Sequence, residues 1–371
     1  MANKIRVACT AAALVPLALL AACGSSGTST TSAGSSSASP AASASSNGVS
    51  LTETGSTLMF PLFGAWQTAY NTTVTTVTIT TAGTGSGTGI ADAGTGTVTI
   101  GASDAYLSPA IQSQYPGLIN IPLTVAALMV NYNLPTVKTP LKLNGTVLAQ
   151  IYTGKIKTWN DPAIAKLNPG VTLPSLKITT LHRADSSGST FLFTSYMNAQ
   201  DPKDWPATAV NTTVSWPSGP AQDAETGSGG MVTGCQGIKG CIAYIGISYL
   251  AKTTAAALGT ASLANKAGKY TQPTSKTINA ALASFSGSTP TTGSQSLINT
   301  SAAKGYPIIN YEYAVVKKTQ PSAPVASALK AFLKWTLTTG AGPTFLSAVG
   351  FEPLPSNVQT IAENQIASIS G

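Results

Sequence analysis

Apolar and polar positions along this chain follow two different periods, and segments of the two kinds alternate. Residues 74–79, 98–100 and 178–181 all combine Val, Ile or Leu with threonines, so all three predict strands. Residues 191–197 and 325–337 instead repeat their apolar side chains at helical spacing. Strands that alternate with helices are typical of an α/β fold, which is the fold class that we expect.

Glycine and serine gather where these predicted strands end. Three such segments, residues 82–90, 101–104 and 183–190, follow the predicted strands, and a fourth, residues 55–61, has the same pattern. Each precedes a stretch that can begin a helix. Ligands of open α/β sheets bind beyond the carboxyl ends of the strands, where helix N-termini offer N–H groups to anions. A single turn of this kind is ordinary turn chemistry, but four of them together predict an anion site.

The N-terminal segment predicts export and a lipid anchor. Lys4 and Arg6 precede an apolar stretch, residues 7–20, that is too short to span a bilayer. The stretch closes with Leu-Ala-Ala-Cys23, which resembles a bacterial lipobox, so we expect residues 1–22 to be a signal peptide and Cys23 to carry acyl chains such as palmitate. An uncleaved anchor helix or an ordinary secretory signal is the alternative.

Residues 23–49 contain mainly Ser, Ala, Gly and Thr without apolar periodicity, and they predict a tether to the extracytoplasmic face of the cell membrane. The remaining chain is long enough for two domains with their own cores. Charged residues make up only 9% of the 371 residues, and the formal net charge is +8. Without Lys4 and Arg6 that charge is +6, and no basic run with interleaved aromatic residues predicts a nucleic-acid partner.

The four cysteines separate into two groups. Cys9 lies in the predicted leader and Cys23 is the predicted lipid site, which leaves Cys235 and Cys241. Because exported proteins meet oxidising conditions, these two predict a disulfide that closes a short loop. No histidine or further cysteine is close enough in sequence to complete a zinc site, so we expect no metal.

Arg183 is the only arginine after the predicted leader, and it follows His182, the only histidine. Arginine presents a rigid fork of donors that matches oxyanions and stays charged at all physiological pH values. A structural ion pair with Asp185 is the simpler interpretation of this arginine. Its position in a Gly/Ser segment, beside three others, favours an anion-binding role instead.

Taken together, these segments resemble the phosphate-binding proteins of the bacterial phosphate ABC transporter. The matching motifs are Gly55-Ser-Thr-Leu-Met-Phe-Pro61, Gly85-Ser-Gly87, Gly101-Ala-Ser-Asp-Ala105 and Arg183-Ala-Asp-Ser-Ser-Gly-Ser-Thr-Phe191, with Ile151-Tyr-Thr-Gly154, Ala243-Tyr-Ile-Gly246 and Tyr311-Glu-Tyr313 in support. The likeness extends from about residue 51 to the C-terminus. The resemblance implies a binding protein without enzymatic activity or a cofactor, acting as a monomer with the permease subunits of an ABC importer.

The same resemblance implies a two-lobed, type II periplasmic-binding-protein-like fold with phosphate in the cleft. Lobe I would contain residues 50–127 and 311–371, and lobe II residues 128–310. Two hinge crossings would lie near residues 126–131 and 308–313.

The resemblance also assigns the ligand contacts. The implied phosphate-binding residues are Ser56, Thr57, Leu58, Phe60, Ser86, Asp104, Arg183, Ser187, Gly188 and Ser189, with Asp185 orienting Arg183. Met59 stands where the family commonly has a hydroxyl residue, so we expect Ser56 or Thr57 to replace that group. Asp104 would accept a hydrogen bond from protonated phosphate and reject sulfate, which has no proton. A helix N-cap is the alternative role for Asp104.

The sequence also allows two functions other than phosphate binding. The same fold could bind another oxyanion or an organophosphate. A secreted hydrolase could use Ser187 with His182 and Asp185, although no Gly-x-Ser-x-Gly elbow and no Walker loop is present in the sequence.

Overall fold

The computed structural model describes residues 48–219 and 221–371. The predicted signal peptide, the Cys23 lipid site and nearly all of the tether lie outside these residues. Within the described residues, no helix is long and apolar enough to cross a membrane.

Three parallel strands form one side of the main sheet. β1 (Val49–Gly55) lies between β2 (Val77–Gly83) and β3 (Ile100–Ser103), and each pair is parallel. The connections are helices, α1 (Phe60–Thr73) after β1 and α2 (Ser86–Thr95) after β2. Parallel neighbours need such crossovers, and the crossovers leave the carboxyl ends of all three strands at one edge.

Two longer strands continue the sheet. β12 (Ile309–Lys317) runs antiparallel to β3 and to β4 (Leu118–Tyr132), and β4 then pairs with β8 (Cys241–Gly246). The partner of β4 changes between Ala127, which pairs with β12, and Leu128, which pairs with β8. Fourteen of the fifteen β4 residues are buried, which is typical of a strand covered on both faces.

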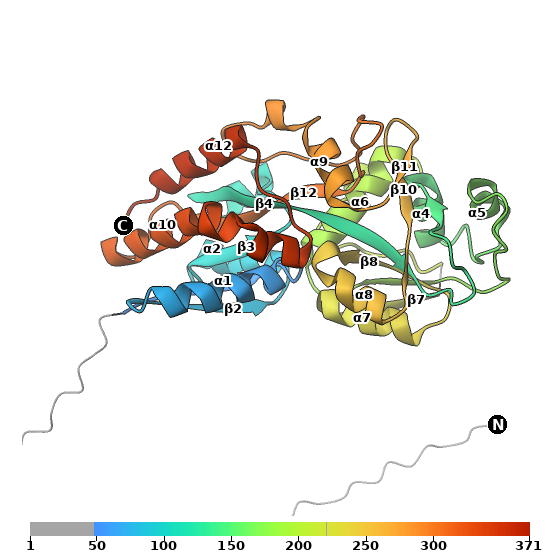
Figure 1. Cartoon of the computed structure of the whole chain (residues 1–371), viewed down its shortest axis with the longest axis horizontal. Coiled ribbons are helices and arrows are strands. Elements are labelled where there is room, and N and C mark those ends of the chain that lie inside the picture. Colours follow the sequence, from blue (N-terminus) through green and yellow to red (C-terminus); the bar gives the residue numbers. More distant parts are fainter. Residues whose placement is uncertain (1–47, 220) are drawn as a thin grey trace, which may run out of the picture. The chain divides into compact units, whose positions relative to one another are not determined.

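Beyond β8, the sheet ends with two more parallel strands. β6 (Thr179–Arg183) pairs with β8 and with β7 (Ala221–Glu225), and the complete order is β2-β1-β3-β12-β4-β8-β6-β7. We call β2, β1, β3 and β12 the first half of the sheet, and β8, β6 and β7 the second half. β4 belongs to both halves and runs from one to the other (Figure 1).

Helices cover both halves. Figure 1 shows α1, α2, α10 (Ala323–Leu337) and α12 (Ser356–Ala367) around the first half. The second half carries α4 (Gly145–Tyr152), α6 (Gly188–Gln200) and α7 (Gly227–Gly237). Helix α10 packs on β1 and β4, and the last helix, α12, packs on α10 and β4, so the two ends of the described chain belong to the same half.

The remaining elements are short. They are α3 (Pro109–Gln114), β5 (Lys142–Leu143), α5 (Pro162–Leu167), α8 (Leu250–Ala255), β9 (Gly259–Thr260), β10 (Ser262–Ala264), β11 (Tyr270–Thr271), α9 (Ser275–Leu282) and α11 (Pro343–Leu346), with five 3-10 turns at Ala207–Ala209, Ile247–Tyr249, Ser286–Ser288, Thr339–Ala341 and Ser347–Val349. β5, β10 and β11 form a separate small sheet, and β9 pairs with β4.

The α/β prediction is confirmed, and most predicted elements occur with shifted ends. The helix predicted over residues 325–337 is α10, and Ser322 caps it through a bond from the Val325 N–H. The prediction that a strand begins at residue 74 was wrong. Val74 is the C-cap of α1, and its N–H donates to the Tyr70 carbonyl at 2.8 Å, so the strand begins only at Val77.

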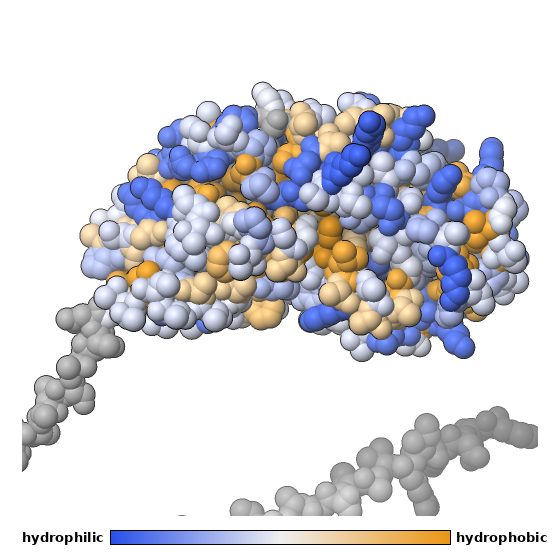
Figure 2. Space-filling view, viewed as in Figure 1, coloured by the Kyte–Doolittle hydropathy of each residue, from blue (hydrophilic) through white to orange (hydrophobic). Residues whose placement is uncertain are grey.

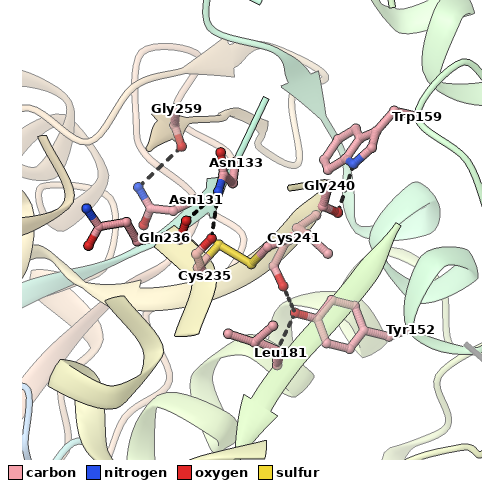
Figure 3. The surroundings of a disulfide bond; sticks show 11 residues. Asn131, Asn133, Tyr152, Trp159, Leu181, Cys235, Gln236, Gly240, Cys241 and Gly259 are labelled. Carbon is pink, nitrogen blue, oxygen red and sulfur yellow. Dashed lines mark hydrogen bonds between the residues drawn. A yellow bond between two sulfur atoms is a disulfide. The ribbon is translucent and has the colours of Figure 1, made fainter. Parts of the chain in front are cut away.

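The predicted disulfide is present. Cys235, near the end of α7, is bonded to Cys241, the first residue of β8, and their Cα atoms are 5.3 Å apart. Figure 3 shows Asn133 beside this link, where its side-chain amide donates to the carbonyls of Cys235 and Gln236 at 2.9 Å each. The helix end and the strand start are therefore held together by a covalent bond and an amide cap.

The surface carries few large apolar side chains. Figure 2 shows hydrophilic atoms over much of the visible face, with hydrophobic atoms in smaller groups between them. Among the described residues, only Phe60 and Leu250 are large hydrophobic residues classed as exposed, at 38% and 42%. Because the chain has few charged residues, uncharged polar side chains such as Ser, Thr and Asn make up much of its hydrophilic surface.

Candidate functional site

The four Gly/Ser segments meet around one buried carboxylate, that of Asp104. Asp104 follows β3 and is 1% exposed. Its Oδ1 accepts a hydrogen bond from Ser56, which follows β1, and its Oδ2 accepts one from Ser189 at 2.9 Å. The Asp104 N–H donates to the Ser86 hydroxyl at 3.2 Å. These contacts join both halves of the sheet, because Ser189 lies on α6 of the second half.

Burial raises the pKa of Asp104, while the hydroxyls of Ser56 and Ser189, contact with Glu312 and the charge of Arg183 lower it in part. The N-cap alternative for Asp104 is wrong. The helix after β3 is α3, and its cap is Ser108, which accepts from the Ile111 N–H at 3.3 Å.

In the first segment, the hydroxyls of Ser56 and Thr57 lie just before Met59 in the sequence. Met59 is fully buried in the core, and its N–H donates to the Ser56 hydroxyl at 3.1 Å. The Thr57 hydroxyl lies 2.9 Å from that of Ser228 at the start of α7, and the Ser228 N–H donates to it at 3.1 Å. Ser56 therefore faces Asp104, whereas Thr57 joins the first half to the second.

The two backbone groups predicted beside Met59 differ in their surroundings. The Phe60 N–H donates to the Ser56 carbonyl at 3.0 Å, so the turn already uses it. The Leu58 side chain is buried, and its carbonyl accepts from the Ser248 hydroxyl at 2.7 Å, another contact between the halves.

Arg183 ends β6 and is 6% exposed. Its Nε donates to Asp185 Oδ1 at 2.7 Å, and its Nη2 donates to Asp185 Oδ2. The Gly227 N–H, at the start of α7, also donates to Oδ1 at 3.0 Å. Burial works against ionisation of Asp185, but the Arg183 bond and charge outweigh it and lower the pKa of that carboxyl. Asp185 thus holds the guanidinium in one orientation.

The start of α6 provides a compact group of donors. Ser187 is the N-cap, and its hydroxyl accepts from the Thr190 N–H at 3.4 Å. Gly188 and Ser189 are the first helical residues, whose N–H groups have no partner within a helix. A Cβ on Gly188 would lie 2.6 Å from both Asp104 Cβ and Ser86 Oγ. Glycine is therefore needed at 188 for the two halves to approach this closely.

Sequence reasoning missed Glu312, which lies in β12 and is 0% exposed. Its carboxyl lies close enough to that of Asp104 for each group to change the pKa of the other. Neighbouring Asn310 donates its amide to the Asp104 carbonyl oxygen, so β12 holds this loop at two points. The signal was available: a single acidic residue stands inside the apolar stretch Ile308-Ile-Asn-Tyr-Glu-Tyr-Ala-Val-Val316.

The contacts of His182 do not form a hydrolase triad. Its ring stacks on Trp216 with centroids 5.1 Å apart, and its Nδ1 lies 3.4 Å from the Arg183 carbonyl. No hydrogen bond in the described part of the chain joins it to Ser187. Burial lowers the pKa of His182. Residues 48–219 and 221–371 also contain no group of three or more His, Cys, Asp or Glu side chains that could hold a metal ion.

Comparisons with known proteins identify the family. A family model described as the PBP superfamily domain matches residues 27–339. The phosphate-binding protein PstS of Methanocaldococcus jannaschii is 35% identical over 268 residues, which cover 68% of this chain and 67% of that protein. The phosphate-binding protein PstS of Pasteurella multocida is 30% identical over 311 residues, covering 83% of this chain and 87% of that protein.

Among solved structures, a phosphate-binding protein from Stenotrophomonas maltophilia has a similar fold, with a TM-score of 0.66. It is 20% identical, and the alignment covers 85% of this chain and 93% of that chain. At this identity the likeness concerns the fold, and it supports the predicted two-lobed architecture. The chain therefore belongs to the PBP superfamily and, within it, to the family of phosphate-binding proteins named PstS.

Proposed function

We propose that this chain binds inorganic phosphate at the cluster of Ser56, Ser86, Asp104, Arg183 and Ser189 and delivers it to the permease of an ABC importer. The observation that carries the proposal is a buried carboxylate, Asp104, on which the charge of a buried guanidinium, Arg183, acts. Membership of a family whose relatives are named phosphate-binding proteins supports it.

Asp104 explains why the anion should be phosphate. A carboxylate repels an anion unless a proton lies between them, and phosphate keeps a proton at neutral pH whereas sulfate does not. With sulfate, Asp104 would remain a buried acceptor without a ligand donor, which is costly. Sites built to bond a particular hydroxyl reject analogues that lack it by roughly 10⁴–10⁵-fold.

Arg183 supplies the positive charge. Two of its five N–H donors bind Asp185 in the described hydrogen bonds, and the other donors remain for the ligand. Further donors come from the first segment and from the start of α6. The proposed set is Ser56, Thr57, Leu58, Ser86, Asp104, Arg183, Ser187, Gly188 and Ser189. We leave out Phe60 because its N–H already donates to Ser56.

We further propose that residues 50–127 with 311–371 and residues 128–310 move as two lobes about β4 and β12. The change of β4 partner between Ala127 and Leu128 supports this division. The contacts of Thr57 with Ser228 and of Leu58 with Ser248 would then belong to the closed form. Closure excludes water, which strengthens each charged hydrogen bond in the site.

The proposed location is the extracytoplasmic face of the cell membrane, with Cys23 lipidated and the body acting as a monomer without catalytic activity. The Cys235–Cys241 disulfide supports an oxidising compartment. Mass spectrometry of the N-terminal peptide tests the anchor, because acylation at Cys23 adds a defined mass and Cys23→Ala abolishes it.

Titration calorimetry of the purified protein with phosphate and with sulfate tests the binding function. We expect tight, saturable binding of phosphate and no detectable binding of sulfate at neutral pH. Comparable binding of both anions would contradict the role of Asp104. Turnover of a chromogenic phosphate ester that Ser187→Ala abolishes would instead favour a hydrolase.

A further inference from the structure

A second buried carboxyl group, that of Glu312, lies beside Asp104. β12 and β3 pair antiparallel, with Tyr313 opposite Ser103 and Ala314 opposite Ala102. Glu312 and Asp104 are the next residues beyond this ladder on the two segments, and their carboxyl groups interact.

Glu312 lacks the partners that a buried ionised carboxylate needs. Both of its side-chain oxygens are buried, and no hydrogen-bond donor within residues 48–219 and 221–371 reaches either of them. Asp104, in contrast, accepts from Ser56 and Ser189. Because two adjacent carboxylates cannot both remain charged in a buried site, one of the pair must hold a proton. The unequal supply of donors places that proton on Glu312.

We propose that Glu312 is a protonated positioning residue that donates a hydrogen bond to Asp104 and so keeps Asp104 ionised and oriented toward the ligand. The effect of Glu312 on ligand binding rests on the proposed function, because Asp104 is the group that would accept a hydrogen bond from the phosphate proton. The pair then carries one negative charge. A second charge would oppose the binding of any anion.

The surrounding charges agree with this assignment. Arg183 is the cation that acts on Asp104, and Asp185 already occupies part of its fork. Burial, followed by the neighbouring Asp104, raises the pKa of Glu312 well above its usual range. Tyr311 and Tyr313, the titratable neighbours on β12, also have raised pKa values, chiefly from burial. The direction of the pKa shift of Glu312 agrees with a carboxyl that keeps its proton.

Two substitutions separate the hydrogen bond from the packing. Glu312→Gln keeps the shape and an N–H donor, whereas Glu312→Leu keeps the bulk without a donor. Glu53→Gln is the matched control. Glu53 is also a buried glutamate, 4% exposed, but it lies in β1 and accepts its bond from Thr81 on β2.

Calorimetry with phosphate gives the first readout. We expect Glu312→Gln and Glu53→Gln to bind within about 3-fold of the unaltered protein, and Glu312→Leu to bind roughly 10–100-fold more weakly, the range expected for a hydrogen bond to a charged group. The alkaline loss of affinity that the unaltered protein shows when Glu312 ionises should be absent in Glu312→Gln. Equal affinity in Glu312→Leu, or an unchanged alkaline loss in Glu312→Gln, would overturn the proposal.

Infrared spectroscopy without phosphate gives a second, independent readout. A protonated carboxyl group absorbs separately from a carboxylate, and at neutral pH we expect Glu312→Gln to lose part of this absorption. Glu53→Gln should lose a different part. If the Glu312 contribution is present but the unaltered protein binds no phosphate, the proposed function fails and the protonated Glu312 stands. If Glu312→Gln leaves the absorption unchanged, the inference fails whatever the protein binds.

Discussion

The two charged groups of the candidate site, Arg183 and Asp104, are buried to a similar degree but neutralised by different means. Arg183 faces a full negative charge, since the Asp185 carboxylate takes two of its donors. Asp104 faces the hydroxyls of Ser56 and Ser189 and the carboxyl of Glu312, none of which is a cation. The positive group is thus held by a direct ion pair, whereas the negative group is held by hydrogen bonds and is affected by Arg183 only through its charge.

This difference separates two tasks. An ion pair keeps its charges over a wide pH range, so Arg183 can supply constant attraction for any small oxyanion. A carboxylate surrounded by donors can discriminate, because it accepts a ligand only if the ligand brings a proton. Affinity should therefore depend most on the positive group, and the choice of anion on the negative group.

The largest effect should come from Arg183→Ala. Removing one partner of a buried pair leaves Asp185 uncompensated, and we expect phosphate affinity to fall by more than about 10³-fold. Arg183→Lys should recover little, because an ammonium lacks the planar fork. Calorimetry measures both, with Lys155→Ala as the control, since Lys155 has an exposed side chain and pairs with Asp204. Near-normal binding by the lysine variant would contradict the need for the fork.

Asp104→Asn should have a smaller effect on phosphate and a larger one on selectivity. The amide keeps an acceptor and gains a donor, so we expect phosphate binding to weaken by roughly 10–100-fold while sulfate binding becomes measurable. Competition between the two anions in calorimetry gives the ratio. A ratio unchanged from the unaltered protein would show that selectivity comes from elsewhere in the cleft.

Gly188→Ala tests whether phosphate binding requires the two halves of the sheet to approach each other closely at residue 188. The added methyl would overlap Asp104 and Ser86, so the halves must separate slightly, and we expect about a 10-fold loss of phosphate affinity. Gly64→Ala is the control, because no atom outside the helix lies within 4 Å of a Cβ at that position in α1. Equal affinity in the two alanine variants would mean that the site tolerates a wider gap.

Glu53→Gln should leave phosphate binding unchanged but alter the pH dependence of stability. Burial raises the pKa of Glu53 from 4.5 to about 8. The folded state therefore binds more protons than the unfolded state between these values, and stability falls as pH rises from 4.5 to 8. The variant should lose this slope, worth up to about 4 kcal/mol at pH 8. Thermal unfolding at pH 5, 6.5 and 8 measures it. Parallel curves for both proteins would contradict the raised pKa.

The parts of the site that could be predicted from sequence are those carried by local motifs. The segment of residues 183–190 encodes its own strand end, its helix cap at Ser187 and the Asp185 contact within a few residues. The Asp104 loop likewise follows directly from the end of β3. These contacts could be predicted because the residues that make them are only a few positions apart in the sequence.

Glu312 and Ser228 were missed because their relations are not local. Glu312 reaches Asp104 through an antiparallel register between strands more than 200 residues apart in sequence. Ser228 reaches Thr57 across the two halves of the sheet. Strand order and the approach of the halves depend on packing over the whole body, which periodicity does not encode. The error in the predicted strand start at Val74 has a local cause, because that residue forms the C-cap of α1 instead.

His182 offers a practical consequence. It is the only histidine of the chain, it immediately precedes Arg183, and its ring is stacked on Trp216. In a proton NMR spectrum, one histidine gives one set of imidazole C–H signals, and the ring current of Trp216 shifts them away from the other aromatic resonances. The unlabelled protein thus contains its own spectroscopic probe one residue from the site, provided that purification relies on a tag without histidine.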